Sequence, residues 1–294
     1  MKFYEYGEKN AHVIVMLPGS FCQASALEYL YKDLEDMFHV IIPDYNGHYE
    51  GGGSFTTRHN EAGQIRKYLK KKGIDSVCMV YGQSMGSEVG MELASQLIKS
   101  GVKVGCCFFD GAPMITLSKP YKLFMYYKFR TMIRMMNNKS IDDVIQWKFL
   151  NKFTNGDTES VRPMIESLIK IAPVISDKSI RNETECCYTF DFPNMTEEMQ
   201  RNIYFLYAKD EKACKTCYWL VKKAYPRARF KVLNGYGHLT YSVKCQSEYV
   251  KLLKKVCKKN MYLSRNDYEH PSFVCYIEAV NEVYEKAKYF QKKK

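Results

Sequence analysis

Short apolar runs alternate with stretches of helical periodicity along the first 113 residues. The runs lie at His12–Leu17, Val40–Ile42, Val77–Tyr81 and Val102–Phe109. Between them, apolar residues recur every three or four positions, which is the spacing of an amphipathic helix. Continuous apolar strands separated by helices are typical of a parallel sheet whose two faces are both covered. This part of the chain is therefore predicted to be an α/β fold built from βαβ units.

The alternation stops after Pro113 and resumes near residue 201. From 114 to 200 the pattern is only helical, and it is rich in Tyr, Met and Phe. Strands then follow at Asn202–Tyr207 and Arg229–Leu233, with helices at Ala213–Ala224 and Ser247–Cys257. The predicted organisation is a core made of residues 1–113 and 201–258, a helical cap inserted at 114–200, and a C-terminal linker with an amphipathic helix at 259–294.

Composition and charge narrow the class of protein. The chain has 294 residues, of which 46% are hydrophobic, so it is long and apolar enough to bury a sizeable core. Its net charge of +12 raises the question of a nucleic-acid partner. The basic residues are dispersed, however, and there is no RNP-type motif, zinc-finger spacing or long basic block. We therefore expect no nucleic-acid partner.

The cysteines and the N-terminus indicate the compartment. There are 11 cysteines, an odd number, and several lie in predicted core strands. The apolar run Val13–Leu17 is too short for a signal peptide, and no run reaches the ~18 residues of a membrane span. A cytoplasmic protein with reduced thiols and no stable membrane insertion is expected. Cys214-x-x-Cys217 has no second pair at a zinc-like spacing, so we interpret it as two thiols on one helix turn.

A serine between two glycines marks the candidate chemistry. Gly82-Gln-Ser84-Met-Gly86 directly follows a buried strand and directly opens a helix. By itself Gly-x-Ser-x-Gly is a weak signal, but this context is the setting of a nucleophile elbow. Such a turn holds the serine in strained backbone geometry, and glycines on either side avoid collisions with neighbouring elements. Ser84 is the predicted nucleophile.

A serine hydroxyl needs a base, and that base needs an acid to orient it. His238 lies in a loop directly after the last predicted strand, where open α/β proteins gather their chemistry, so it is the predicted base. His48 follows an earlier strand in a Gly-rich loop. The remaining histidines lie at strand starts, on a polar helix or in the linker: His12, His39, His59 and His270.

Three carboxylates are candidates for the acid. Asp210 follows the strand Asn202–Tyr207 and lies between serine and histidine in chain order, so it is the predicted acid. Asp110 is a rival because it also ends a strand. Glu211 is adjacent to Asp210 and is the third candidate.

Together these segments resemble the α/β-hydrolase superfamily, most closely its lid-bearing, esterase-like branch. The resemblance covers 1–113 and 202–258 in order, and it rests on these segments: Leu17–Phe21 at the oxyanion loop, Asp44–His48 with Gly52–Ser54 at the Asp-x-x-Gly-His-Gly-x-Ser turn, Gly82–Gly86, Asp210, and Gly235–His238. It implies a mostly parallel central sheet with helices on both faces, and it places the cap 114–200 where the family carries its lid.

The resemblance also implies an oxyanion hole. By the family pattern, the backbone N–H groups of Ser20 and Met85 would form it, with the N–H of Phe21 as the alternative to that of Ser20. Phe21 is also expected to contact substrate. The chain departs from the family at Pro18, which stands where a histidine is usual before Gly19.

The expected function is that of a serine hydrolase that cleaves carboxylic esters through an acyl-enzyme, without metal or cofactor. Thioester, peptide or carbon–carbon bond cleavage would use the same residues, and a ligand-binding homologue without turnover is the alternative from another class. A small acyl compound is the expected substrate. The aromatic and methionine residues of the cap either line an acyl pocket or form the cap's own core.

Overall fold

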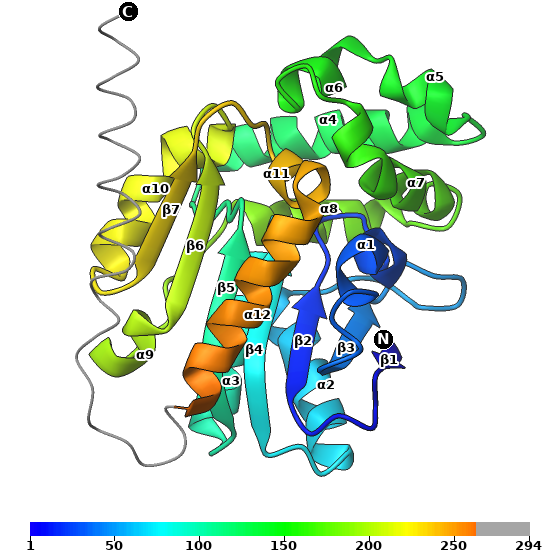
Figure 1. Ribbon diagram of the computed structural model, residues 1–294. Coiled ribbons are helices and arrows are strands. Elements are labelled where there is room, and N and C mark those ends of the chain that lie inside the picture. The colour runs from blue at the N-terminus through cyan, green and yellow to red at the C-terminus, as the bar shows by residue number, and fades with distance from the viewer. Residues whose placement is uncertain (263–294) are drawn as a thin grey trace, which may run out of the picture. The chain divides into compact units, whose positions relative to one another are not determined.

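The structure is a computed structural model and describes residues 1–262 (Figure 1). The C-terminal linker and amphipathic helix expected at 259–294 lie outside the described residues, apart from the first four positions of the linker. Those four positions, 259–262, extend the last described helix instead of forming a linker.

A seven-stranded sheet runs through the centre of the molecule, in the order β1-β3-β2-β4-β5-β6-β7. The strands are β1 (Lys2–Tyr6), β2 (Val13–Leu17), β3 (His39–Asp44), β4 (Ser76–Gln83), β5 (Lys103–Asp110), β6 (Ile203–Ala208) and β7 (Arg229–Leu233). Every neighbouring pair is parallel except β1 with β3. The predicted mostly parallel α/β sheet is confirmed. The insertion does not interrupt the pairing, because β6 lies directly beside β5.

Helices cover both faces of this sheet (Figure 1). The helices of the core are η1 (Ala24–Leu27), α1 (Glu28–Tyr31), α2 (Arg58–Lys71), α3 (Met85–Lys99), α9 (Glu197–Arg201), α10 (Lys212–Ala224), α11 (Thr240–Lys244) and α12 (Gln246–Tyr262). Buried residues of α2, α3 and α10 form one continuous cluster with the strands. In Figure 1, α12 crosses the opposite face. The central strands β2 and β4 are almost entirely buried, because helices cover both of their faces.

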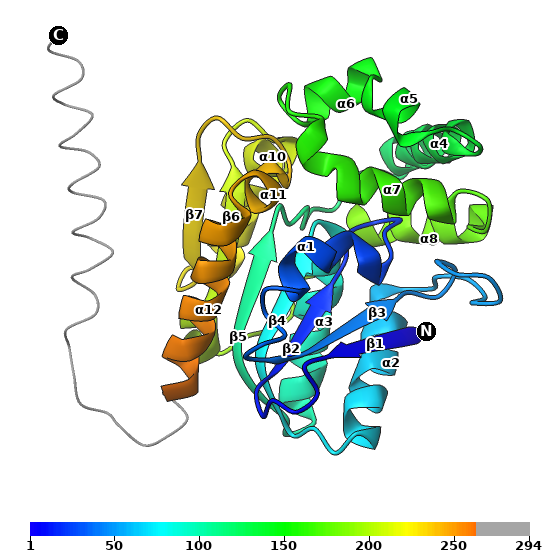
Figure 2. The same cartoon turned by 45° about the vertical axis from the view of Figure 1, so that its right-hand side comes forward.

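The inserted segment folds as helices above the carboxyl ends of the strands (Figures 1 and 2). They are α4 (Lys119–Met136), α5 (Ile141–Ile145), α6 (Lys148–Phe153), η2 (Glu159–Val161), α7 (Arg162–Ile171) and α8 (Asp177–Cys187). Their inward residues, among them Tyr126, Ile133 and Met136, form a second hydrophobic cluster, which also includes Phe21 of the core. At least these aromatic and methionine side chains thus build the cap's own core.

Two elements differ from the sequence prediction. Strand β1 was not predicted, because its sequence KFYEY has no continuous apolar run and its side chains are exposed or half-buried at the edge of the sheet. Leu27, Leu30, Tyr31 and Leu34 recur at helical spacing, which predicts a helix over residues 24–36, but the helical structure there is regular only to Tyr31. Beyond it the chain continues in turns with bonds such as that from the N–H of Leu34 to the carbonyl of Tyr31, which still bury Leu30 and Leu34.

The cysteines of the described part of the chain are all free. Cys214 and Cys217 lie one turn apart on α10, as predicted, and Cys217 is buried. Within residues 1–262, no three His, Cys, Asp or Glu side chains converge in a way that could hold a metal ion. In the same part of the chain, no helix is both long enough and apolar enough to cross a membrane.

Candidate active site

Ser84 stands at the sharp turn between β4 and α3. Its backbone has φ 50° and ψ −124°, a combination that non-glycine residues rarely adopt. Its N–H donates to the carbonyl of Asp110 at 2.8 Å, which ties the turn to the end of the neighbouring strand β5. Strain of this kind persists only where the surroundings enforce it, and it is characteristic of sites that hold a reactive group. The predicted strand, turn and helix around Ser84 are therefore present.

The two glycines that flank Ser84 are required by close packing. A Cβ atom at Gly82 would lie 2.4 Å from the carbonyl oxygen of Gly86, and a Cβ atom at Gly86 would lie 2.2 Å from the carbonyl oxygen of Leu17. Both distances are far below van der Waals contact, and the obstructing atoms are backbone atoms that cannot move aside. The turn therefore presses α3 against β4 and against the end of β2, where the predicted oxyanion loop begins.

That loop passes beside Ser84. A Cβ atom at Gly19 would lie 3.5 Å from the Cβ of Ser84, so the segment Gly19–Phe21 runs along the serine. The N–H of Met85 is the first of helix α3, and it has no carbonyl of its own helix to donate to. The N–H of Phe21, the alternative to that of Ser20, already donates to Glu183 at 2.8 Å.

His238 is held by Glu211. The His238 Nδ1 and the Glu211 Oε2 atoms are 2.5 Å apart, and both side chains are buried. The second carboxylate oxygen of Glu211 accepts the N–H of Ala208 at 2.8 Å, which fixes the side chain against the end of β6. With Nδ1 facing a carboxylate, the proton of a neutral imidazole stays on that nitrogen, and Nε2 is left as the basic atom.

The prediction that Asp210 orients His238 is corrected by these contacts. Asp210 is exposed, and its carboxylate pairs only loosely with Lys215, at 3.8 Å. The turn after β6 directs the side chain of Asp210 to solvent and that of Glu211, one residue later, inward. The adjacent acid, weighed in the sequence as the third candidate, is the one the structure brings to the histidine.

Asp110, the second candidate, is buried below the site but bonds elsewhere. Its carboxylate accepts a hydrogen bond from the hydroxyl of Tyr249 on α12 at 2.7 Å. Burial, and to a smaller extent the charge of Glu211, raise the pKa of Asp110 to about 7, against the lowering effects of the Tyr249 hydrogen bond and of His238. Asp110 thus supports the sheet end on which Ser84 rests, through its backbone carbonyl.

Backbone contacts bring Ser84 and His238 to neighbouring strand ends. Gly111 follows Asp110, the residue whose carbonyl binds the Ser84 N–H. A Cβ atom at Gly111 would lie 2.5 Å from the Cε1 of His238, so the imidazole ring rests directly on the Gly111 backbone. The predicted nucleophile and the predicted base therefore flank the same end of β5.

The cap reaches His238 from the other side. The ring of Phe153, at the end of α6, meets the imidazole edge-on with ring centroids 4.9 Å apart. The N–H of His238 donates to the Phe153 carbonyl at 3.4 Å. An apolar ring against one face of the imidazole excludes water from that side.

A second buried network joins the cap to the oxyanion loop. Glu183 of α8 lies fully buried, with one carboxylate oxygen 2.7 Å from His48 Nε2 and the other accepting the Phe21 N–H. His48 Nδ1 bonds the carbonyl of Cys22 at 2.9 Å. Burial lowers the pKa of His48, but the Glu183 charge and hydrogen bonds outweigh it, so this pKa is raised above its ordinary value. His48, predicted as a loop residue, thus braces the loop that carries Ser20.

Glu88, one helical turn after Ser84, is a buried carboxyl group outside these networks. Within the described residues neither of its oxygens has a hydrogen-bond partner. Burial raises its pKa well above the ordinary value, although Arg58 acts in the opposite direction.

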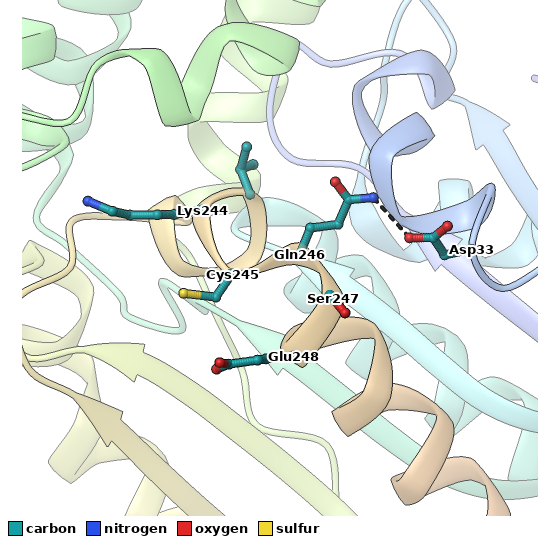
Figure 3. A pocket seen from close by; sticks show the side chains of 7 residues that line it. Asp33, Lys244, Cys245, Gln246, Ser247 and Glu248 are labelled. Atoms are coloured by element: carbon teal, nitrogen blue, oxygen red, sulfur yellow. Dashed lines mark hydrogen bonds between the residues drawn. The ribbon is translucent and has the colours of Figure 1, made fainter.

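A surface pocket of about 500 Å³ lies apart from this site (Figure 3). Asp33 and residues 243–248 line it, and Gln246 spans it to donate to the Asp33 carboxylate at 2.9 Å. None of Ser84, Glu211 and His238 belongs to its lining. The pocket lies between the start of α12 and the turns after α1. Its lining residues do not pair a nucleophile with a base.

Known structures share this architecture. An alpha/beta hydrolase family protein from Desulfitobacterium hafniense superposes with a TM-score of 0.66 at 16% identity, over 87% of this chain and 99% of that one. The chain has the α/β-hydrolase fold. The enol-lactonase from Burkholderia xenovorans (TM-score 0.63, 15% identity, 87% and 96% coverage) and an esterase from Exiguobacterium antarcticum (0.62, 16%, 87% and 94%) are also similar.

No protein-family model matches the sequence, and no curated protein is significantly similar to it. At identities of this size the similarity extends to the α/β-hydrolase fold and no further. The predicted fold class is confirmed. Within this fold, Ser84 at the elbow and His238 after β7 occupy the carboxyl edge of the sheet, where ligands bind in open α/β structures.

Proposed function

We propose that the protein is a serine hydrolase that cleaves carboxylic esters. The observation that carries this proposal is the strained backbone of Ser84 at the strand-to-helix turn, with φ 50° enforced by the contacts around Gly82 and Gly86. The strained turn presents the Ser84 hydroxyl at the edge of the sheet where His238 also lies. The similarity to esterases and to an enol-lactonase supports the same reaction class.

In the proposed reaction Ser84 Oγ attacks the acyl carbonyl carbon while His238 Nε2 takes the serine proton. Glu211 holds Nδ1 and stabilises the imidazolium that forms. The N–H groups of Ser20 and Met85 bind the oxyanion, and each such donor contributes about 3 kcal/mol to the transition state. The imidazolium returns its proton to the leaving alcohol, and water then hydrolyses the acyl-enzyme with His238 again as base.

The nearby thiol of Cys22 does not suit the role of nucleophile. Burial and, to a smaller extent, the charge of Glu183 raise the pKa of Cys22 to about 12. At neutral pH this group is therefore a thiol, and the reactive form of cysteine is the thiolate. The elbow serine is the nucleophile that the surroundings favour.

A fluorophosphonate probe tests the proposal directly. The wild-type protein is expected to be labelled and to hydrolyse short chromogenic esters. Ser84→Ala should lose both the labelling and the ester hydrolysis. It should keep the circular-dichroism spectrum of the wild type, because the substitution removes only the reactive hydroxyl. Ser95→Ala, which replaces a buried serine of helix α3, is the matched control and should be labelled as wild type. Labelling that survives in Ser84→Ala would refute the assignment.

A further inference from the structure

The outward face of cap helix α4 carries large apolar side chains in solvent. Phe124 is 61% exposed, Tyr127 54% and Met135 55%. Buried residues of the same helix, Tyr126, Ile133 and Met136, pack into the cap instead. The exposed ring side chains thus contribute nothing to the cap's own core. Exposed large apolar side chains gathered on one helix indicate a surface that contacts something else.

Positive charge accompanies these side chains. Helix α4 contains five Lys or Arg residues and no Asp or Glu. Lys122, Arg130 and Arg134 pair with carboxylates of α8, whereas Lys119 and Lys128 form no ion pair within residues 1–262. The face is therefore both apolar and basic.

Helix α10 extends the same surface. The Lys212 Nζ atom donates to the Tyr121 hydroxyl at 2.8 Å, which joins the beginnings of α10 and α4. Helix α10 also has four lysines and no acidic residue. Trp219 is 71% exposed, and at seven residues from Lys212 it lies on the same side of the helix. Cys217 and Val221 face the core from the opposite side.

We propose that α4 and α10 form a docking surface for an anionic lipid bilayer. Aromatic rings are favoured at the boundary between headgroups and acyl chains, and lysines reach from there to the headgroup charges. Each Lys or Arg near such a surface adds attraction that falls off within a Debye length. Lysine is depleted in protein–protein interfaces, whereas here it is the commonest cation, so a lipid surface fits better than an acidic protein.

The inner side of α4 connects the proposed docking surface to the candidate active site. Phe129 packs edge-on against Phe21 of the oxyanion loop, with centroids 5.4 Å apart, and stacks on Tyr188 after α8. One helix thus contacts the bilayer outside and the candidate active site inside. If the proposed esterase function holds, its acyl substrates come from the lipid phase. The docking itself does not depend on that function.

Vesicle binding tests the docking without any measurement of activity. The full chain is mixed with vesicles of phosphatidylcholine that contain about one third phosphatidylglycerol, and bound protein is measured by sedimentation at low and high salt. Binding is expected at low salt, and it should weaken on pure phosphatidylcholine and at high salt. Phe124→Ser with Trp219→Ser should lower the partition coefficient about tenfold, as should Lys128→Glu with Lys223→Glu.

Matched controls lie away from this surface. Ile98→Ser, an exposed apolar residue near the end of α3, and Lys9→Glu with Lys67→Glu should bind as wild type. Absence of binding by the wild type, or unchanged binding of both surface variants, would overturn the proposal. So would a lipid-free dimer that Phe124→Ser with Trp219→Ser dissociates, because it would assign the surface to a second copy. Esterase activity without vesicle binding would refute only the docking.

Discussion

At the scale of single residues, two neighbouring acids in one turn have opposite surroundings. Glu211 is buried, accepts the Ala208 N–H and touches His238, whereas Asp210 projects into solvent toward Lys215. A buried carboxylate with both oxygens engaged can hold an imidazole in one tautomer. A solvated carboxylate that lies away from the imidazole contributes little, because water and salt screen its charge.

Replacing each of these two acids by its amide distinguishes their contributions to catalysis. Glu211→Gln should lower kcat by about 10²–10⁴-fold, because the amide no longer stabilises the imidazolium and favours the wrong tautomer. Asp210→Asn should change kcat by less than about twofold, in line with the small effect of an exposed charge. Steady-state kinetics on a chromogenic ester, with circular dichroism as the check on folding, decides the matter. A severe loss in Asp210→Asn beside an active Glu211→Gln would restore the original prediction.

The sequence could place Ser84 and His238 at neighbouring strand ends, but it could not select the acid beside His238, for a physical reason. A serine between glycines that directly joins a strand to a helix predicts a strained turn from local sequence alone. His238 is the histidine that follows the last core strand. The direction of two successive side chains in a turn depends on the local dihedral angles and on the Ala208 N–H, which no pattern of residue types encodes. Both acids therefore satisfied the same sequence rule.

At the scale of elements, cap helix α8 supports the predicted oxyanion loop through Glu183. The loop residue Phe21 has φ 58°, an unfavourable conformation for an aromatic residue, and its N–H is held by the Glu183 carboxylate. His48 approaches the same carboxylate from the core and bonds the loop carbonyl of Cys22. The position of the Ser20 N–H, one residue before Phe21, thus depends on a contact made by the cap.

Two substitutions at Glu183 test this support. Glu183→Ala should lower kcat at least tenfold with a smaller effect on KM, because a displaced donor weakens only the transition state. It should also lower the free energy of unfolding by about 3–5 kcal/mol, since His48 loses its buried partner. Glu183→Gln should recover most of kcat, because its amide can accept the Phe21 N–H and donate to a neutral His48.

If Glu183 had only a structural role, its substitution would lower the free energy of unfolding without a selective loss of kcat. Kinetics and urea unfolding of both variants are therefore measured together, with Glu166→Ala on cap helix α7 as the matched control. If Glu183→Ala and Glu183→Gln unfold at different urea concentrations but share the wild-type kcat, the loop does not depend on this contact.

Elements were predictable where periodicity and burial agree. Strands β2 to β6 follow from apolar runs because they are largely buried on both faces. The break after Pro113 marks the cap because helical periodicity replaces short apolar runs there. Strand β1 lies at an edge and is half exposed, so it lacks that signal. The contact of α8 with the oxyanion loop joins residues more than 160 positions apart, which periodicity cannot reveal.

At the scale of the whole molecule, buried acids shape the dependence of stability on pH. Asp110 and Glu88 both lie in the core beneath the site, and burial raises the pKa of each. An acid whose pKa is raised on folding keeps its proton in the native state over a range where the unfolded chain has already lost it. The free energy of unfolding then falls as pH rises through that range, the reverse of the effect of a salt-bridged carboxylate.

For Asp110 the range extends from its ordinary pKa of 3.8 to about 7. Between pH 5 and pH 8, the stability of the wild type relative to Asp110→Asn should fall by about 2–3 kcal/mol, at up to 1.36 kcal/mol per pH unit below the native pKa. Asparagine suits the comparison because its carbonyl oxygen can still accept the Tyr249 hydroxyl. Urea unfolding at several pH values measures the difference, and Asp210→Asn, an exposed acid, should track the wild type throughout. Parallel curves for wild type and Asp110→Asn would show that Asp110 is already ionised in the folded protein at pH 5.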